Sequence, residues 1–326
     1  MALLDVRNLT VRFDTPDGEV QAVSDLSFTM EKGECLGIVG ESGSGKSQTF
    51  MAAMGLLSDN GRATGDVLFG GANLLTAGEK QLNAIRGNKA AMVFQDHMTS
   101  LTPHMKVGRQ MAEVLVRHRG LSAAAARDAA IAMLKRVQIP DPERRAAMYP
   151  HELSGGLRQR VMIAMSLLCH PELLIADEPT TALDVTVQAL ILDLIREVKE
   201  QDRTSVILIT HDLGVVAGLA DRVAVMYAGR IVELGDVAQI FAAPQHPYTQ
   251  GLLACTPRLD DVGKVLKTIS GQPPNLQRLP PGCAFAPRCP FKIAACAERP
   301  PLRPAAGGGL KACARDDIAS INRAAS

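Results

Sequence analysis

One short segment, residues 40–47, constrains the fold of this chain more than any other feature of the sequence. Its residues, GESGSGKS, match the pattern G-x-x-x-x-G-K-[ST] at every position. An apolar run at residues 34–40 predicts a strand before it, and residues 47–57 predict a helix after it. In such a unit the glycines let backbone N–H groups converge on a phosphate, and the helix presents its positive end. The sequence therefore predicts an α/β nucleotide-binding fold; without these flanking elements the segment would be only a Gly- and Ser-rich turn.

The loop pattern assigns roles to its side chains. Lys46 is expected to reach the β- and γ-phosphates of the nucleotide, and the Ser47 hydroxyl is expected to coordinate Mg²⁺. Because side chains would obstruct the approach of the β-phosphate, the glycines are as much a part of the prediction as Lys46. The other residues predicted to bind the nucleotide are Gly40, Glu41, Ser42, Gly43, Ser44, Gly45 and Gln48.

Two carboxylates follow a second apolar run, residues 173–176, and form the next part of the predicted site. Asp177 and Glu178 come directly at the end of this predicted strand. Neighbouring strand residues point to opposite faces, but the end of a strand can release both side chains toward one site. Asp177 is suited to hold Mg²⁺ through water, and Glu178 is suited to polarise the attacking water as a general base. The pair favours hydrolysis over phosphoryl transfer to a second substrate; the alternative interpretation is a solvated acidic turn.

The order of strands and helices predicts an α/β core with a mainly parallel sheet. Residues 173–176 and 205–209 have the composition of buried parallel strands, with a helix predicted between them at residues 185–200. Residues 3–27 alternate apolar and polar side chains, which predicts a small antiparallel sheet before the phosphate loop. A further helix is predicted at residues 121–137, and Pro140, Pro142 and Pro150 follow its end.

Composition and charge limit the class of protein. The 326 residues include 35 basic and 34 acidic ones, a formal net charge of +1, which gives no support for nucleic-acid binding. No stretch approaches the roughly 18 apolar residues expected of a membrane-spanning helix. The first residues lack the basic and apolar regions of a secretion signal. We therefore expect a cytosolic protein, whose role at a membrane would depend on partner subunits.

Residues 153–160, LSGGLRQR, lie upstream of the two carboxylates and resemble the signature loop of ABC-type ATPases. Ser154, Gly155 and Gly156 would supply a hydroxyl and a helix N-terminus, which together form an anion site. In that family the loop contacts the γ-phosphate of an ATP molecule held by the opposite subunit. Leu157 departs from the Gln that is usual in the family, although peptide-importer subunits often carry an apolar residue there. The alternative interpretation of Ser154 is simple capping of the following helix.

Further landmarks of ABC-type ATPases follow in the family's order. Gln95 resembles the loop glutamine that senses Mg²⁺ and the membrane partner, and Asp184, in residues 182–184, resembles part of the loop that crosses between paired subunits. His211, directly after a predicted strand, resembles the γ-phosphate switch histidine, although a lone histidine is more often structural. Phe13 aligns with the aromatic residue that stacks on adenine, although a strand Phe is more often part of a core.

The resemblance implies ATP and Mg²⁺ as ligands. The catalytic residues that it implies are Lys46, Gln95, Glu178 and His211. The Mg²⁺ ligands that it implies are Ser47, Gln95 and Asp177.

The resemblance narrows to the oligopeptide/dipeptide importer branch, of which nickel and glutathione importers are relatives. It rests there on residues 94–103 and 177–186, and on residues 246–249, His-Pro-Tyr-Thr, which open a C-terminal extension in that branch. The implied organisation is an ABC-type P-loop ATPase domain over residues 1–243, with a helical subdomain at about 97–157, and an irregular, Cys- and Pro-rich extension over residues 244–326.

This branch implies a function and a set of partners. The function is ATP hydrolysis that energises the import of short peptides or related small solutes. The implied partners are a second, different but homologous ABC ATPase subunit, two transmembrane permease subunits and an extracytoplasmic solute-binding protein, with no nucleic acid. The chain would be peripheral, at the cytoplasmic face of the inner membrane. Pairing of two identical chains stays open, as do a soluble ABC ATPase of DNA repair, chromosome organisation or translation and a small-molecule kinase.

The seven cysteines divide into two groups. Cys35, Cys169 and Cys255 lie in apolar or mixed surroundings and are expected to pack as small hydrophobic residues. The other four are Cys283, Cys289, Cys296 and Cys313. Their spacing, C-x5-C-x6-C and then sixteen residues to the last Cys, fits no CxxC zinc ribbon, but four thiolates could bind Zn²⁺ or an iron–sulfur cluster. Some peptide-importer ATPases that this chain resembles are thought to hold a [4Fe–4S] cluster here, which the resemblance therefore implies; the alternative is four unligated cysteines in a proline-rich tail.

Overall fold

The computed structural model describes residues 2–95, 100–181, 183–256 and 268–319. The chain divides into two units: the first comprises Met1–Met30, Cys35–Thr76 and Thr210–Ser326, and the second comprises Glu31–Glu34 and Ala77–Ile209. Of the sequence patterns used above, residues 96–99 and Ala182 lie outside the described residues. Within the described ranges, no helix has both the length and the apolar character needed to cross a membrane.

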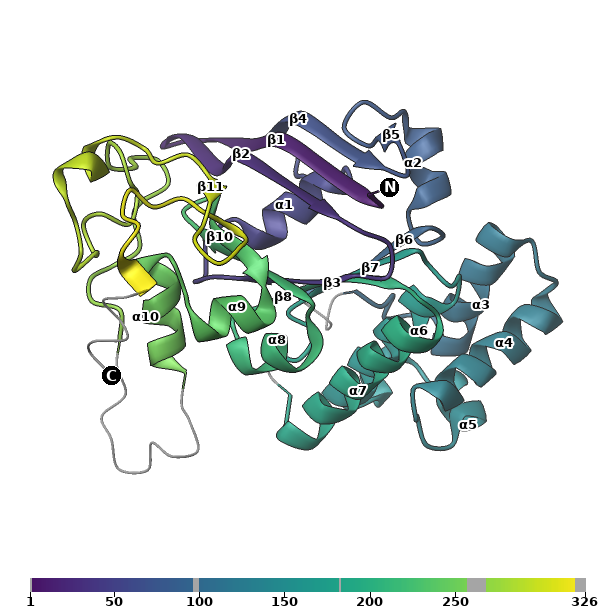
Figure 1. Cartoon of the computed structure of the whole chain (residues 1–326). Coiled ribbons are helices and arrows are strands. Elements are labelled where there is room, and N and C mark those ends of the chain that lie inside the picture. The colour runs from purple at the N-terminus through teal and green to yellow at the C-terminus, as the bar shows by residue number, and fades with distance from the viewer. Residues whose placement is uncertain (1, 96–99, 182, 257–267, 320–326) are drawn as a thin grey trace. The chain divides into compact units, whose positions relative to one another are not determined.

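The first unit begins with an antiparallel sheet in the strand order β2-β1-β4-β5. These strands are β1 (Leu4–Thr15), β2 (Gly18–Met30), β4 (Gly61–Phe69) and β5 (Ala72–Asn73). Leu4, Val6 and Val11 of β1 are buried, because alternate strand side chains point to the covered face of the sheet. Helix α1 (Lys46–Ala53) packs against this sheet (Figure 1). The Phe50 ring of α1 lies edge-on to Phe28 of β2. The antiparallel sheet predicted from residues 3–27 is thus confirmed.

A second group of strands in the first unit carries the phosphate loop. The strands are β3 (Cys35–Val39), β9 (Arg222–Tyr227), β10 (Arg230–Asp236), β12 (Leu310–Lys311) and β11 (Arg303–Pro304). β3 and β9 are parallel, and β10 pairs antiparallel with both β9 and β12. Every residue of β3 is buried, as expected for an apolar run in a parallel sheet that is covered on both faces. Helices α8 (Leu213–Leu219) and α9 (Val237–Ala242) pack against these strands.

The second unit contains parallel strands in the order β6-β7-β8. Their bounds are Ala90–Val93 for β6, Leu173–Asp177 for β7 and Ser205–Thr210 for β8. The five residues of β7 and the six of β8 are all buried, which agrees with the two apolar runs that predicted them. The connection between them contains α7 (Val185–Gln201), whose buried face includes Leu194 and Val198 as the sequence predicted.

Most of the remaining helices of the second unit form a helical subdomain. They are α3 (Val107–Arg119), α4 (Ala123–Arg136), α5 (Pro142–Ala146), the 3-10 turn η1 (Pro150–Glu152) and α6 (Gly155–Leu167). The same unit also contains the short helix α2 (Glu79–Ile85). α3, α4 and α6 pack together, and α5 packs against α3 and α4 (Figure 1). Ser122 caps α4 by accepting a hydrogen bond from the Ala125 N–H, so this helix lies where residues 121–137 predicted it.

The C-terminal extension belongs to the first unit and is mostly irregular. Its regular elements are α10 (Pro247–Cys255), the 3-10 turn η2 (Ala294–Ala297), β11 and β12. Tyr248 and Phe285 are buried in one hydrophobic cluster with Tyr227 of β9. These aromatic side chains of the extension therefore complete the core of the first unit, which helps a proline-rich segment with little apolar sequence to stay folded.

Candidate active site

The phosphate loop lies in the first unit, between β3 and α1. Its backbone requires glycine at two positions. Gly40 has φ 155° and Gly45 has φ 93°, and a Cβ at either position would overlap a backbone carbonyl oxygen, that of Met226 or of Ala22. Ser42 and Gly43 at the tip of the loop are exposed. The loop therefore offers an open concave backbone directly before the N-terminus of a helix, the arrangement that binds phosphates.

Lys46 is the first residue of α1 and is held over the loop. Its Nζ donates to the carbonyl oxygens of Gly40, at 2.8 Å, and Glu41, at 3.0 Å. The residue is only 6% exposed. Ser47 and Gln48 follow it and are half-buried at the start of the helix. This arrangement keeps an ammonium group and a hydroxyl at the anion-binding end of α1.

Two further predicted residues belong to the first unit. Phe13 is half-buried on β1, opposite Gly61 of β4, and a Cβ at Gly61 would lie 2.7 Å from the Phe13 ring. His211 is exposed and follows directly after β8. Asp212, the next residue, caps α8 by accepting from the Gly214 N–H at 2.8 Å. His211 is therefore fixed between a strand end and a capped helix.

The carboxylates lie in the second unit, at the end of β7. Asp177 is the last residue of the strand and is 4% exposed. Glu178 has φ 47°, in the left-handed region, and its N–H donates to the Ile209 carbonyl oxygen at 2.9 Å. This turn moves the chain away from the strand direction directly after Asp177. Because of this change in backbone direction, the side chains of Asp177 and Glu178 need not point to opposite faces of the sheet.

The Glu178 carboxylate is held by two side chains. Its Oε2 accepts from Gln95 Nε2 at 3.1 Å and from Thr181 Oγ1 at 2.8 Å. The structure thus brings Gln95 and Glu178 together, although they lie far apart in the sequence. Thr181 was not among the predicted site residues, since a threonine in a loop gives no signal before the turn at Glu178 is known.

The signature loop precedes α6. Ser154 caps this helix by accepting from the Leu157 N–H at 3.4 Å, and it is exposed. Gly156 faces α7, where an added Cβ would lie 3.1 Å from Val187 Cγ1. Asp184 caps α7 by accepting from the Val187 N–H at 2.9 Å. Four of the predicted residues therefore lie at or beside the N-termini of two helices of the second unit: Ser154, Gly155, Gly156 and Asp184. The hydrogen bond that Ser154 makes in this structure is the helix cap that the alternative interpretation predicted.

Gln159 is a second residue that sequence reasoning missed. Its Nε2 donates to the Pro179 carbonyl oxygen at 2.8 Å, and the residue is 2% exposed. It therefore ties α6, which begins at the signature loop, to the residue that follows Glu178. The sequence shows only a glutamine shortly after the signature loop, and its burial is known only from the structure.

The predicted site residues divide between the two units. Those of the first unit are Phe13, Gly40, Glu41, Ser42, Gly43, Ser44, Gly45, Lys46, Ser47, Gln48 and His211. Those of the second unit are Gln95, Ser154, Gly155, Gly156, Asp177, Glu178 and Asp184.

The four clustered cysteines line one small cavity in the extension. They are Cys283, Cys289, Cys296 and Cys313, and His246, Phe291 and Arg315 are among the other lining residues. The sulfur donors that an iron–sulfur cluster needs therefore come together from segments that are separate in the sequence. Yet among the described residues no group of three or more His, Cys, Asp and Glu side chains is arranged so that it could hold a metal ion.

All seven cysteines, each within the described ranges, are free thiols. Burial raises the pKa of Cys289 to about 11, and burial also raises the pKa of Cys283 and of Cys313. Cys283, Cys289 and Cys313 are therefore harder to deprotonate than an exposed thiol.

Two family models match this chain. The model of the ABC transporter family matches residues 23–181, and that of the oligopeptide/dipeptide transporter C-terminal region matches residues 232–296. The oligopeptide transport ATP-binding protein OppD of Salmonella typhimurium strain LT2 is 57% identical over 95% of this chain and 93% of the relative. The dipeptide transport ATP-binding protein DppD of Bacillus subtilis strain 168 is 53% identical over 90% of this chain and 88% of the relative.

Solved structures agree with these matches. The dimeric, post-hydrolysis structure of the ATP-binding cassette MJ0796, bound to ADP and Pi, has a TM-score of 0.66 at 28% sequence identity, over 72% of this chain and 98% of that chain. The chain belongs to the ABC transporter family as an ABC-type ATPase, and it carries the oligopeptide/dipeptide transporter C-terminal region.

Proposed function

We propose that this chain is the ATP-hydrolysing subunit that energises the import of short peptides through a membrane ABC transporter. The observation that carries the hydrolytic part is the Glu178 carboxylate, held by Gln95 at 3.1 Å and Thr181 at 2.8 Å directly after Asp177. The peptide part is supported by two relatives, which are named for oligopeptide and dipeptide transport and match about nine-tenths or more of this chain.

Glu178 is the general base of the proposed reaction. The hydrogen bonds from Gln95 and Thr181 orient one of its carboxylate oxygens, and the carboxylate accepts a proton from the attacking water in this reaction. Lys46 and the loop N–H groups neutralise and position the phosphates, and His211 contacts the γ-phosphate. Phe13 stacks on adenine.

The Mg²⁺ ligands of the proposed site are oxygen donors, as this hard cation prefers: the Ser47 hydroxyl, the Gln95 amide and the Asp177 carboxylate. Asp177 fits this role because a carboxylate that is 4% exposed at a strand end requires compensation by donors or a cation. When bound, Mg²⁺ supplies positive charge to the β- and γ-phosphate oxygens.

The proposed site is completed by a second chain. One polypeptide carries one phosphate loop and one signature loop, and in the proposed assembly these serve two different ATP molecules. Exposure of Ser154, at the start of α6, is what such a contact requires. The dimeric state of the cassette MJ0796 supports pairing of such domains. We propose that the second chain is a different, homologous ATPase subunit.

The complete assembly adds two transmembrane permease subunits and an extracytoplasmic solute-binding protein, with this chain peripheral at the cytoplasmic face of the inner membrane. Its ATPase domain is proposed to span residues 1–243, with the helical subdomain at about 97–157, and its extension residues 244–326. Nickel or glutathione is the alternative cargo. A soluble ABC ATPase of DNA repair or translation is disfavoured by the match of residues 232–296 to the transporter C-terminal region.

Copurification and transport test this function. The tagged full-length chain is purified from membranes with its partner subunits and placed in liposomes with the binding protein. We expect ATP-dependent uptake of a radiolabelled short peptide, abolished by Glu178→Gln. Copurification of nucleic acid instead of permease subunits, or uptake of nickel or glutathione but not of peptide, would overturn the proposal.

We also propose that the four thiols lining the extension cavity hold a [4Fe–4S] cluster, with Zn²⁺ or no ligand as the alternatives. Their convergence on one cavity supports this proposal. The test is anaerobic purification followed by iron, sulfide and zinc analysis and by the visible absorption spectrum. Colourless protein without stoichiometric iron would contradict it.

A further inference from the structure

The phosphate loop is bound by a side chain of the C-terminal extension. Arg288 Nη1 donates to Glu41 Oε2 at 2.7 Å, and Arg288 Nη2 donates to Glu41 Oε1 at 3.0 Å. The Arg288 side chain is 5% exposed and that of Glu41 is 24% exposed. Ion pairs with two parallel hydrogen bonds between planar charged groups are among the strong ones in proteins. Burial of Arg288 also limits the access of water that would compete for these hydrogen bonds.

Arg288 is itself fixed by its surroundings. Its Nε donates to the Ser270 carbonyl oxygen at 3.0 Å, and its Nη2 donates to that of Ile269 at 3.2 Å. The guanidinium carbon lies 5.9 Å from the centre of the Tyr227 ring and 5.9 Å from that of Phe285. The side chain is therefore already ordered for the contact with Glu41 and loses little freedom in making it.

The backbone of Glu41 is held from the extension as well. The Glu41 N–H donates to the Tyr248 hydroxyl at 2.8 Å. Tyr248, on α10, is fully buried, with its ring centre 4.6 Å from that of Tyr227 and 5.4 Å from that of Phe285. Both the side chain and the N–H of Glu41 are thus paired with residues of the extension, directly beside the Gly40 carbonyl that accepts from Lys46.

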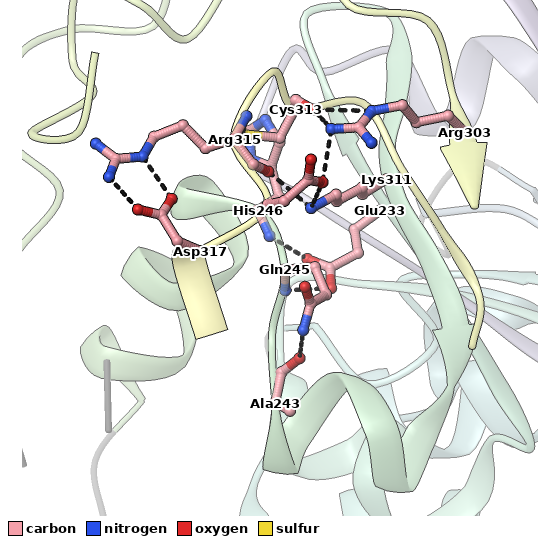
Figure 2. Close-up of polar contacts among 10 residues, drawn as sticks. Glu233, Ala243, Gln245, His246, Arg303, Lys311, Cys313, Arg315 and Asp317 are labelled. Carbon is pink, nitrogen blue, oxygen red and sulfur yellow. Dashed lines mark hydrogen bonds and ion pairs between the residues drawn. The ribbon is translucent and has the colours of Figure 1, made fainter. Parts of the chain in front are cut away.

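This part of the extension is anchored to β10 by a buried polar network (Figure 2). The Glu233 carboxylate accepts from the Gln245 N–H at 2.6 Å and from the His246 N–H at 2.9 Å. His246 Nδ1 in turn accepts from the Tyr248 N–H at 3.1 Å. At the other end of the extension, Lys311 Nζ donates to the Arg315 carbonyl oxygen at 2.7 Å. Tyr248, which holds the Glu41 N–H, is therefore tied through His246 to the buried Glu233 carboxylate of β10.

We propose that Arg288 and Tyr248 are positioning residues of the nucleotide site: Arg288 neutralises the Glu41 carboxylate and Tyr248 fixes its backbone, so that the loop can accept the polyphosphate of ATP. Without Arg288, a carboxylate would remain uncompensated in a loop that binds a multiply charged anion, and like charges at short range repel. The extension thereby sets the ATP affinity of the chain. This inference rests on ATP binding by the loop and not on peptide import.

Equilibrium binding of ATP to the purified full-length chain tests this role. Arg288→Met is expected to raise the Kd for ATP about tenfold, which corresponds to ~1.4 kcal/mol. Adding Glu41→Gln to Arg288→Met removes the uncompensated charge and is expected to restore most of the affinity. The defect of Arg288→Met alone is also expected to shrink as ionic strength rises, because salt screens the repulsion.

The matched control is Arg303→Met, which removes an arginine of the extension that contacts the Cys313 carbonyl and Asp316 but not the phosphate loop. Its Kd for ATP is expected to equal that of the unaltered chain. Thermal unfolding of each variant separates lost affinity from lost folding. Should Arg288→Met not fold, Arg288→Lys and Tyr248→Phe replace it; each leaves most packing in place and is expected to raise the Kd severalfold.

Unaltered affinity in the folded Arg288→Met, Arg288→Lys and Tyr248→Phe variants would overturn the inference. So would a salt-independent loss in Arg288→Met that Glu41→Gln does not recover, since this would be the result of a purely structural defect. An unaltered chain that binds no ATP would overturn the proposed function and this inference together.

Discussion

At the scale of single residues, the proposed role of Glu178 as general base depends on its backbone conformation. Its left-handed φ of 47° costs about 1 kcal/mol for a residue with a Cβ. The hydrogen bond from its N–H to the Ile209 carbonyl and those from Gln95 and Thr181 to its carboxylate offset that cost. The strained turn, Gln95 and Thr181 together orient the carboxylate that we propose as the general base.

Glu178→Gln is expected to retain ATP binding and to reduce kcat by about 10²–10⁴-fold, because an amide cannot accept the proton of the attacking water. Steady-state ATPase assays and ATP-binding measurements check this. Glu172→Gln, which alters only an exposed ion pair with Lys32, is the control and is expected to keep full activity. Hydrolysis at the normal rate in Glu178→Gln would remove Glu178 from its role.

Lys46→Ala is expected to act on a different quantity, the affinity for ATP. It removes the ammonium group that the Gly40 and Glu41 carbonyls hold over the loop. A loss of binding of ~2 kcal/mol or more is expected for a charge-assisted contact to phosphate. Titration with ATP measures the Kd of the variant. An unchanged Kd would show that Lys46 does not contribute to nucleotide binding.

Sequence reasoning reached Lys46, Asp177 and Glu178 because each belongs to a contiguous pattern beside a predicted strand. It missed Thr181 and Gln159, whose roles depend on where the chain goes after Glu178 turns into the left-handed region. That turn is a tertiary effect, since the N–H of Glu178 bonds to a residue of the neighbouring strand.

At the scale of elements, helix α6 connects the signature loop to the carboxylates within the second unit. It begins at Ser154, which caps it, and its buried Gln159 donates to the Pro179 carbonyl oxygen. A shift of α6 would therefore strain or break the hydrogen bond to Pro179, the residue after Glu178. This helix is thus the physical link between the signature loop and the hydrolytic group of the same chain.

Gln159→Leu should cost about 1 kcal/mol of unfolding free energy, because the Pro179 carbonyl loses its donor while the apolar volume is retained. It should also lower kcat, since the chain after Glu178 is no longer held. Urea unfolding and ATPase assays check both effects. Gln201→Leu makes the same change at the exposed end of α7 and should affect neither quantity.

The strands and long helices were predictable because runs of apolar residues, or an alternation of apolar and polar residues, extend over several positions of the sequence. The predicted strands at 173–176 and 205–209 and the helix at 185–200 agree with β7, β8 and α7 within a residue or two. Short elements such as β5, β11 and β12 were not predicted, since two residues carry no periodic signal.

The packing of the extension could not be predicted from its sequence either. Tyr248 and Phe285 are isolated aromatic residues in proline-rich sequence, and nothing near them in the chain indicates that they join Tyr227 in one core. Their burial is a property of the fold of the whole first unit.

Phe285→Ala is expected to destabilise the chain by about 3–5 kcal/mol, because a buried ring is replaced by a cavity. Phe241→Ala, at a partly buried residue packed against the same cluster, should cost clearly less. Urea unfolding of the two full-length variants compares them. Equal stability of both variants would show that the extension does not share the core of the first unit.

At the scale of the whole molecule, the chain is proposed to be half of an ATP-driven motor. Its global charge of +1 gives it no general attraction for nucleic acid or anionic membrane, so specificity must lie in its surfaces and partners. The contact between Glu41 and Arg288, 247 positions apart, could not be predicted from one sequence, because neither residue belongs to a shared pattern. It joins the part of the chain that is specific to this transporter branch to the loop that all phosphate-loop ATPases share.

The central claim is that the signature loop completes the ATP site of a neighbouring chain. Photo-crosslinking tests it most directly: Ser154→p-benzoylphenylalanine is introduced into the full-length chain, the transporter is purified with its partner subunits, and it is irradiated with and without saturating ATP. The account predicts an ATP-dependent cross-link from position 154 to the phosphate loop of the neighbouring ATPase subunit, identified by mass spectrometry. Cross-links that form only within the chain, or that do not depend on ATP, would contradict it.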